Sequence, residues 1–105
     1  MDAKTVCRKA AAYLRTYGWH QGIMGIPGTS MCLVGALRYA AGFESPMTPS
    51  IAYDVFNQAV SLLFPKINAQ VRGRTRAITL VVWNDTALRR VEEVLALLDD
   101  AAKEE

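Results

Sequence analysis

The sequence predicts a mainly α-helical, compact single domain over residues 1–105, with about four principal helices. Apolar residues recur every three or four positions in several segments, and glycines or prolines stand between those segments. Hydrophobic residues make up 51% of the chain and charged residues 21%, which is typical of a globular protein. The 105 residues are enough to bury a core without disulfide support.

The first apolar stripe predicts a helix over residues 3–17, with Asp2 as its N-cap and Gly18 at its end. A second, short helix is expected between the N-cap Ser30 and the terminating Gly42, and we expect it to be the most buried element. Small side chains within it, at 35 and 36, would let another helix approach closely.

The stretch "GWHQGIMGIPGTSMC" at 18–32 predicts a tight Gly/Pro-rich connection after the first helix, which could form a hairpin. We expect Trp19 to be buried at one end and Gln21 to bond to backbone groups. The residues from Ile23 to Ile26 would form an exposed apolar tip.

A third helix is expected to begin near Thr48 or Ser50, to accept Pro49 in its first turn and to end at Pro65. Its apolar stripe consists of Ile51, Ala52, Val55, Phe56, Ala59, Val60, Leu63 and Phe64.

Residues 77–86, "AITLVVWNDT", favour a strand by composition, but a lone strand would have no pairing partner, so a short buried helix is predicted. Asn84, Asp85 or Thr86 would cap the last helix. The apolar stripe of that helix consists of Leu88, Val91, Leu95, Leu98 and Ala102, widened by Val94 and Ala101. The core is expected to contain Val6, Tyr13, Leu33, Leu37, Phe56, Leu63, Trp83, Val91 and Leu95.

Charge is unevenly distributed, although the net charge is only +2. Residues 1–43 carry five basic groups and one acidic group, whereas residues 77–105 carry three basic and seven acidic groups. No secretory signal and no membrane-spanning run is expected, so the prediction is a cytoplasmic protein with two free thiols and Cys7 in the core.

Cysteine-dependent hydrolysis is one alternative function. Cys32 at a helix N-terminus, His20 as base, and Asn84 or Asp85 as orienting group would supply the parts. The order of these residues differs from the papain-like order, and free cysteine is most often a buried core residue, so this alternative ranks below protein binding.

Nucleic-acid binding through residues 66–76 is a second alternative, because this segment contains Arg72, Arg74 and Arg76. The basic footprint is small and the acidic C-terminal segment opposes it, so a solvated linker is favoured. One histidine and two distant cysteines do not make a zinc site, and "GIPG" lacks the pattern of a phosphate-binding loop. No metal, cofactor or catalytic residue is therefore expected.

Four motifs together resemble an uncharacterised family of small proteins from actinobacteria and their phages. They are "GWHQG" at 18–22, "CLVGAL" at 32–37, "WND" at 83–85 and "EEVLALLDDAA" at 92–102. The resembling family often has cysteine at the position of His20, which argues against His20 as a catalytic base. It usually has a threonine cap at the position of Arg90, which suggests that the last helix of this chain begins earlier, at Thr86. The resemblance brings no established enzyme activity and no cofactor. It implies a short protein encoded by an actinobacterium or, as favoured for so compact a version, by a mycobacteriophage.

The expected function is binding to a host protein and modulation of its activity, to the detriment of host growth, without catalysis. The expected contact residues are His20, Ile23, Met24, Arg72, Arg74 and Arg76, together with the acidic face of the final helix. An exposed apolar patch could equally support a homodimer.

Overall fold

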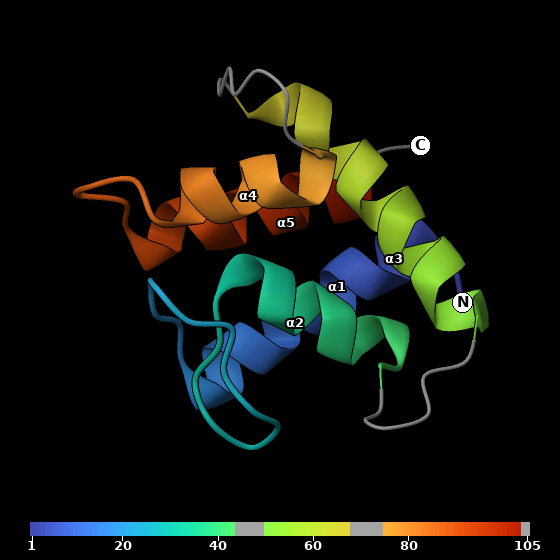
Figure 1. Cartoon of the computed structure of the whole chain (residues 1–105), viewed down its shortest axis with the longest axis horizontal. Coiled ribbons are helices and arrows are strands. Elements are labelled where there is room, and N and C mark those ends of the chain that lie inside the picture. Colours follow the sequence, from blue (N-terminus) through green and yellow to red (C-terminus); the bar gives the residue numbers. More distant parts are fainter. Residues whose placement is uncertain (44–49, 68–74, 104–105) are drawn as a thin grey trace.

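The structure, a computed structural model, describes residues 1–43, 50–67 and 75–103. In these residues the chain is mainly helical, as predicted, with five α-helices instead of about four and no named strand (Figure 1). The helices are α1 (Ala3–Tyr17), α2 (Leu33–Ala41), α3 (Ser50–Leu63), α4 (Arg76–Asn84) and α5 (Val91–Lys103), and a short 3-10 turn, η1 (Phe64–Lys66), follows α3.

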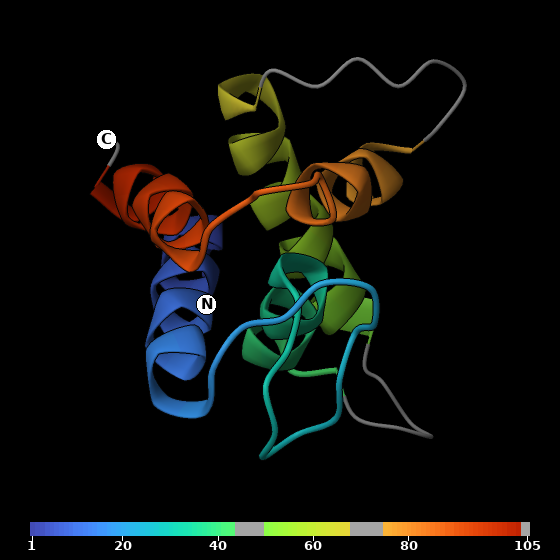
Figure 2. The same cartoon turned by 90° about the vertical axis from the view of Figure 1, so that its left-hand side faces the viewer.

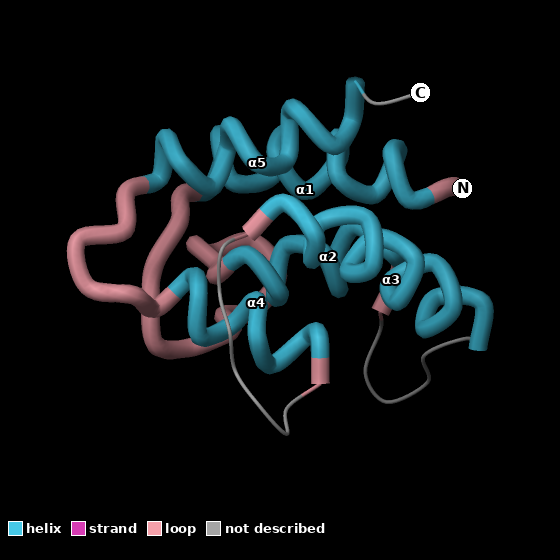
Figure 3. The backbone as a smooth tube through the Cα atoms, turned by 90° about the horizontal axis from the view of Figure 1, so that it is seen from above, coloured by secondary structure: helices cyan, strands magenta, loops and turns pink. Residues whose placement is uncertain are grey.

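The helices form two layers (Figures 2 and 3). Helices α1 and α5 lie side by side in one layer, while α2, α3 and α4 pack against one another in the other. Helix α1 also contacts α2 and α3, so it joins the layers. One ion pair crosses between α1 and α5, from the guanidinium of Arg15 to the carboxylate of Asp99.

The predicted ends of α1 are confirmed. The Asp2 carboxylate accepts a hydrogen bond from the backbone N–H of Thr5 at 2.8 Å, and this bond lowers the pKa of Asp2 below its usual value. Gly18 follows the helix with φ +98°, a conformation that favours glycine.

The start of α2 differs from the prediction. Cys32, not Ser30, is the N-cap, and its Sγ accepts from the backbone N–H of Gly35 at 3.3 Å. Ser30 lies two residues before the N-cap, and its hydroxyl instead pairs with Nδ1 of His20 at 2.8 Å. The end at Gly42 is confirmed, and α2 is buried at every residue except 38 and 39.

The last helix begins at Val91, so the predicted start at Thr86 is wrong. Arg90 occupies the capping position, and its backbone N–H donates to Glu93 Oε1 at 2.9 Å, while Glu93 N–H donates back to the Arg90 carbonyl at 3.0 Å. The backbone bond from Arg90 is the main cause of the lowered pKa of Glu93. Leu88 does not belong to the buried stripe, because it lies in the preceding loop with φ +68° and is 92% exposed.

One hydrophobic cluster fills the space between the two layers. Seven of the nine predicted core residues are buried in it, but Val91 and Leu95 are only half-buried and α5 buries Val94 and Leu97 instead. Ile51, predicted in the stripe of α3, is 73% exposed. The short helix predicted within residues 77–86 is confirmed as α4, which runs from Arg76 to Asn84. The expected cap Thr48 and the first-turn Pro49 lie outside the described residues.

Candidate functional site

The loop between α1 and α2, residues 18–32, is closed at its base by backbone hydrogen bonds. The N–H of His20 donates to the carbonyl of Met31, and the N–H of Met31 donates to the carbonyl of Gly18, each at 3.2 Å. The resulting bridge between Trp19 and Met31 is parallel, so the connection is not the hairpin that the glycines suggested. The loop returns beside its own start and projects from the helices (Figure 2).

Asn84, the last residue of α4, is fully buried and holds this base in place. Its Oδ1 accepts from Nε1 of Trp19 at 2.6 Å and from the backbone N–H of Leu33 at 3.0 Å. Its Nδ2 donates to the carbonyl of His20 at 3.3 Å and to Oδ1 of Asp85 at 2.9 Å. All four hydrogen-bonding positions of the side-chain amide are therefore used.

Gln21 and Gly22 extend this attachment toward the end of α4. Gln21 Nε2 donates to the carbonyls of Asn84 and Thr86, each at 2.9 Å. Gly22 N–H donates to Asp85 Oδ1 at 3.0 Å. The prediction that Asn84, Asp85 or Thr86 caps the last helix is therefore wrong, because that helix begins at Val91 and these residues bind the loop to the end of α4.

Met24 lies directly on α2 because Gly35 has no side chain. A Cβ at Gly35 would lie 2.3 Å from the carbonyl oxygen of Met24, which also accepts the backbone N–H of Cys32 at 3.4 Å. Gly35 was expected to let another helix approach closely, but it instead lets the loop at Met24 pack against α2. Gly25, with φ +90°, is equally constrained, since its Cβ would lie 2.4 Å from the carbonyl oxygen of Ser30.

The far end of the loop is bound to α1 by Tyr13. The hydroxyl group of this buried tyrosine donates to the carbonyl of Thr29 at 2.5 Å and accepts from the N–H of Gly28 at 3.0 Å. Its ring contacts Tyr17 and Tyr39 at centroid distances of 4.7 and 4.8 Å, and these two rings are about half exposed.

The side chains between these attachments point outward as predicted. Ile23 is 69% exposed, Ile26 is 68% exposed and Met24 is 40% exposed. We call these three side chains the apolar tip. His20, predicted as a contact residue beside them, is half-buried, and its Nε2 pairs with the Ile23 carbonyl at 2.7 Å. Its position indicates a role in holding the loop.

Among the residues proposed for cysteine chemistry, Asn84 contacts His20, but it bonds to the backbone carbonyl of His20 and not to its ring. Burial raises the pKa of the Cys32 thiol, and Asp85 raises it further, which disfavours the thiolate that a nucleophile needs. Both ring nitrogens of His20 are engaged by Ser30 and Ile23, and no hydrogen bond of the described residues joins His20 to Cys32.

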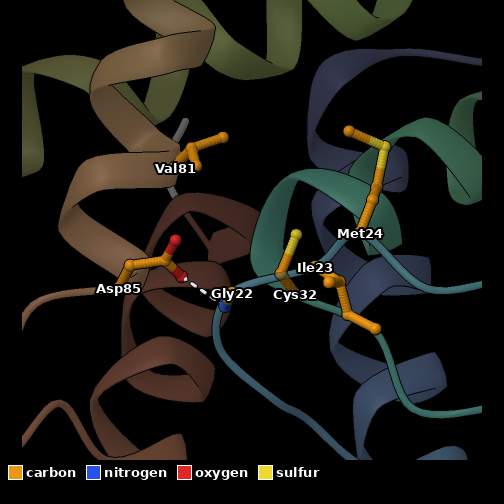
Figure 4. Close-up of a pocket in the computed structure, with 6 residues that line it drawn as sticks. All are labelled: Gly22, Ile23, Met24, Cys32, Val81 and Asp85. Carbon is orange, nitrogen blue, oxygen red and sulfur yellow. Dashed lines mark hydrogen bonds between the residues drawn. The ribbon is translucent and has the colours of Figure 1, made fainter.

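A small pocket of about 140 Å³ opens between the loop and α4 (Figure 4). It is lined by Gly22, Ile23, Met24, Cys32, Val81 and Asp85. The sequence shows no pattern that would have revealed it, because its residues come from three separate segments.

The predicted basic segment is described only at its ends. Arg72 and Arg74 lie outside the described residues. Arg76 is the first residue of α4; its guanidinium donates to Ser61 Oγ at 3.2 Å and lies 5.3 Å from the centre of the Phe64 ring. On the acidic face of α5, Asp99 is already paired with Arg15.

In the described ranges, no group of three or more His, Cys, Asp or Glu side chains is placed to hold a metal ion. No helix found there is long and apolar enough to cross a membrane.

The fold and this site define a mainly helical protein in which a glycine-rich loop is fixed to the end of a helix by a buried asparagine. The chain belongs to a family of unknown function, DUF6197, whose model matches residues 1–104. This agrees with the predicted resemblance to an uncharacterised family. Searches among curated proteins and among solved structures gave no significant match.

Proposed function

We propose that the chain is a protein-binding module of phage type, which docks its apolar tip on a host protein and modulates the activity of that protein without catalysis of its own. The observation that carries this proposal is the tip itself: three apolar side chains are held out into solvent by a loop whose backbone is hydrogen-bonded at both ends.

A fixed loop suits binding because little conformational entropy is lost when a partner covers it. Exposing isoleucine to water is unfavourable for an isolated chain, and burial of apolar surface is the main favourable term in association. The half-exposed rings of Tyr17 and Tyr39 lie against Tyr13, which also holds the loop. Tyrosine is enriched at protein interfaces, so these rings support the same surface.

The actinobacterial host and the phage origin rest on the four motifs that resemble the small actinophage proteins. An acidic surface on the host protein would be attracted to the basic residues 1–43, which contain a single acidic side chain.

The test is affinity capture from an actinobacterial lysate with three tagged variants: Ile23→Asp, Ile26→Asp and Ile51→Asp. Ile51 on α3 is a matched control, because it is 73% exposed and receives the same substitution as Ile26, which is 68% exposed. We expect a host protein to bind the wild type and Ile51→Asp, and to bind the tip variants about 30-fold more weakly, as for a hot-spot residue.

Two results would contradict the proposal. One is the absence of any host protein above background, even at low salt. The other is a captured protein that binds Ile26→Asp as well as it binds the Ile51→Asp control.

A further inference from the structure

We propose that the pocket beside the apolar tip receives a lysine side chain of the partner, with its aliphatic carbons inside the pocket and its ammonium group on the carboxylate of Asp85. The inference depends on the proposed function for its biological partner, but the pocket's chemistry can be tested without that partner.

The first argument is that only one of the two carboxylate oxygens of Asp85 takes part in the hydrogen bonds that hold this side chain in place. Its Oδ1 accepts hydrogen bonds from Gly22 N–H at 3.0 Å and Asn84 Nδ2 at 2.9 Å. Oδ2 accepts no hydrogen bond from any residue that the structure describes, and Figure 4 shows it turned away from Gly22, on the side of Val81. The carboxylate is thus held in one orientation with one oxygen available at the pocket.

The second argument is that the described residues supply no cation for Asp85. The nearest arginines in sequence are used elsewhere: Arg89 pairs with Glu93 at 2.8 Å and Arg90 with Glu92 at 3.6 Å. No lysine or arginine within 1–43, 50–67 or 75–103 forms an ion pair with Asp85. Because charge-assisted hydrogen bonds are stronger than neutral ones, an external cation is the complementary ligand for this oxygen.

The third argument is the size and lining of the pocket. Apart from Asp85, it is lined by a glycine backbone, the apolar side chains of Ile23, Met24 and Val81, and the thiol of Cys32. A volume of about 140 Å³ is close to that of apolar cavities that bind benzene, about six heavy atoms. A lysine side chain has about five heavy atoms, four of them apolar, and lysine commonly buries its carbons while its ammonium group meets a polar partner.

The fourth argument is position. Ile23 and Met24 belong both to the pocket and to the apolar tip. A partner segment that covers the tip would therefore pass the pocket opening. A segment with one lysine next to an apolar side chain could place the lysine in the pocket and the apolar side chain on the tip.

The test uses amide NMR spectra during titration with N-acetyl-lysine methylamide, and with N-acetyl-norleucine methylamide as the matched neutral probe. We expect saturable shifts with the lysine probe at Gly22, Ile23, Val81 and Asp85, and about tenfold weaker binding of the norleucine probe, since the charged hydrogen bond is lost.

Three variants sharpen the test. Asp85→Asn keeps an acceptor for Gly22 but removes the charge, so the lysine probe should bind it no better than the norleucine probe. Val81→Phe should fill the pocket and abolish binding of both, and it keeps the test valid if Asp85→Asn does not fold. Asp54→Asn makes the same substitution at an exposed position on α3, away from the pocket, and should bind the lysine probe as the wild type does.

Equal binding of the lysine probe to the wild type and Asp85→Asn, or shifts scattered away from the pocket, would overturn the inference. Capture of a host protein that depends on Ile26 but is unchanged in Asp85→Asn would also overturn it, while leaving the proposed function standing. Specific binding of the lysine probe without any captured host protein would support the pocket and refute the proposed function.

Discussion

Replacing Asn84 by alanine should detach the loop from the helices and destabilise the whole fold. The substitution removes the only acceptor that the described residues provide for Nε1 of Trp19 and for the backbone N–H of Leu33. The Leu33 N–H is buried, whereas Trp19, which was expected to be buried, is only half-buried beside the fully buried Asn84.

The magnitude follows from those two donors. A buried donor left without a partner costs about 1–3 kcal/mol, and the partly buried Nε1 of Trp19 costs less than the buried N–H of Leu33. Asn84→Ala should therefore lower the free energy of unfolding by about 2–5 kcal/mol. In a domain of this size each kcal/mol lowers Tm by about 4 °C, so a loss of about 8–20 °C is expected.

Urea denaturation followed by tryptophan fluorescence is a suitable assay, because Trp19 bonds to Asn84 directly and Trp83 reports on the core. Asn57→Ala is the matched control: Asn57 is exposed on α3, and its loss should change stability by no more than about 0.5 kcal/mol. If Asn84→Ala is as stable as that control, the buried amide does not stabilise the loop and the reasoning from its hydrogen bonds is refuted.

A second variant separates the acceptor from the donor. Asn84→Asp keeps an oxygen for Trp19 and Leu33 but places a carboxylate against the His20 carbonyl and Asp85. Burial beside that charge raises the pKa of the new carboxyl group above its unfolded value, so the variant should lose stability as pH rises through that pKa. At lower pH, where the group is protonated and can donate, the variant should approach the wild type.

Further predictions concern single groups. Gly35→Ala should push the Met24 backbone off α2 and lower stability by about 1–3 kcal/mol, measured by urea denaturation, because the new Cβ would lie 2.3 Å from a carbonyl oxygen; no change in stability or in the Met24 amide shift would refute this. Asp2 has a lowered pKa, so its contribution to the free energy of unfolding is present above its unfolded pKa near 3.8 and is lost as pH falls through its folded pKa. Acid denaturation of Asp2→Asn should lack this pH dependence. Identical acid-denaturation curves for the wild type and Asp2→Asn would contradict the prediction. Burial raises the pKa of Cys7 to about 11, so this thiol should react with a disulfide reagent at pH 8 only after denaturant is added. Fast labelling of Cys7 in the folded protein would refute that statement.

The helices could be predicted from the sequence because each leaves a periodic stripe. The errors concern apolar residues that fit the register of a buried face without being buried. Ile51 lies in the first turn of α3 and is exposed there, whereas Leu88 lies before α5 begins. Apolar spacing indicates a face only as far as the helix extends.

The polar residues were harder to place, for a different physical reason. Serine and asparagine suit a helix cap and a buried hydrogen-bonded position equally well. Ser30 and Asn84 were both interpreted as caps, but one pairs with His20 and the other joins segments about sixty residues apart in the chain. Only the three-dimensional positions of Trp19 and Leu33 distinguish these roles.

The apolar tip was predicted correctly as exposed because "GIMGIPG" brackets its side chains with glycines. The pocket beside it could not be predicted, since Val81 and Cys32 are brought together by the packing of α4 on α2.

The loop separates the residues that shape it from those that point outward. Its hydrogen bonds use backbone groups and side chains such as Asn84 and Tyr13, which stand outside the tip, whereas no hydrogen bond of the described residues uses the side chains of Ile23 or Ile26. Exchanges at these two positions should therefore leave the fold intact. Related chains could diverge in what they recognise while keeping one scaffold, and a library randomised at 23 and 26 would be a stable starting point for selecting new binding specificities.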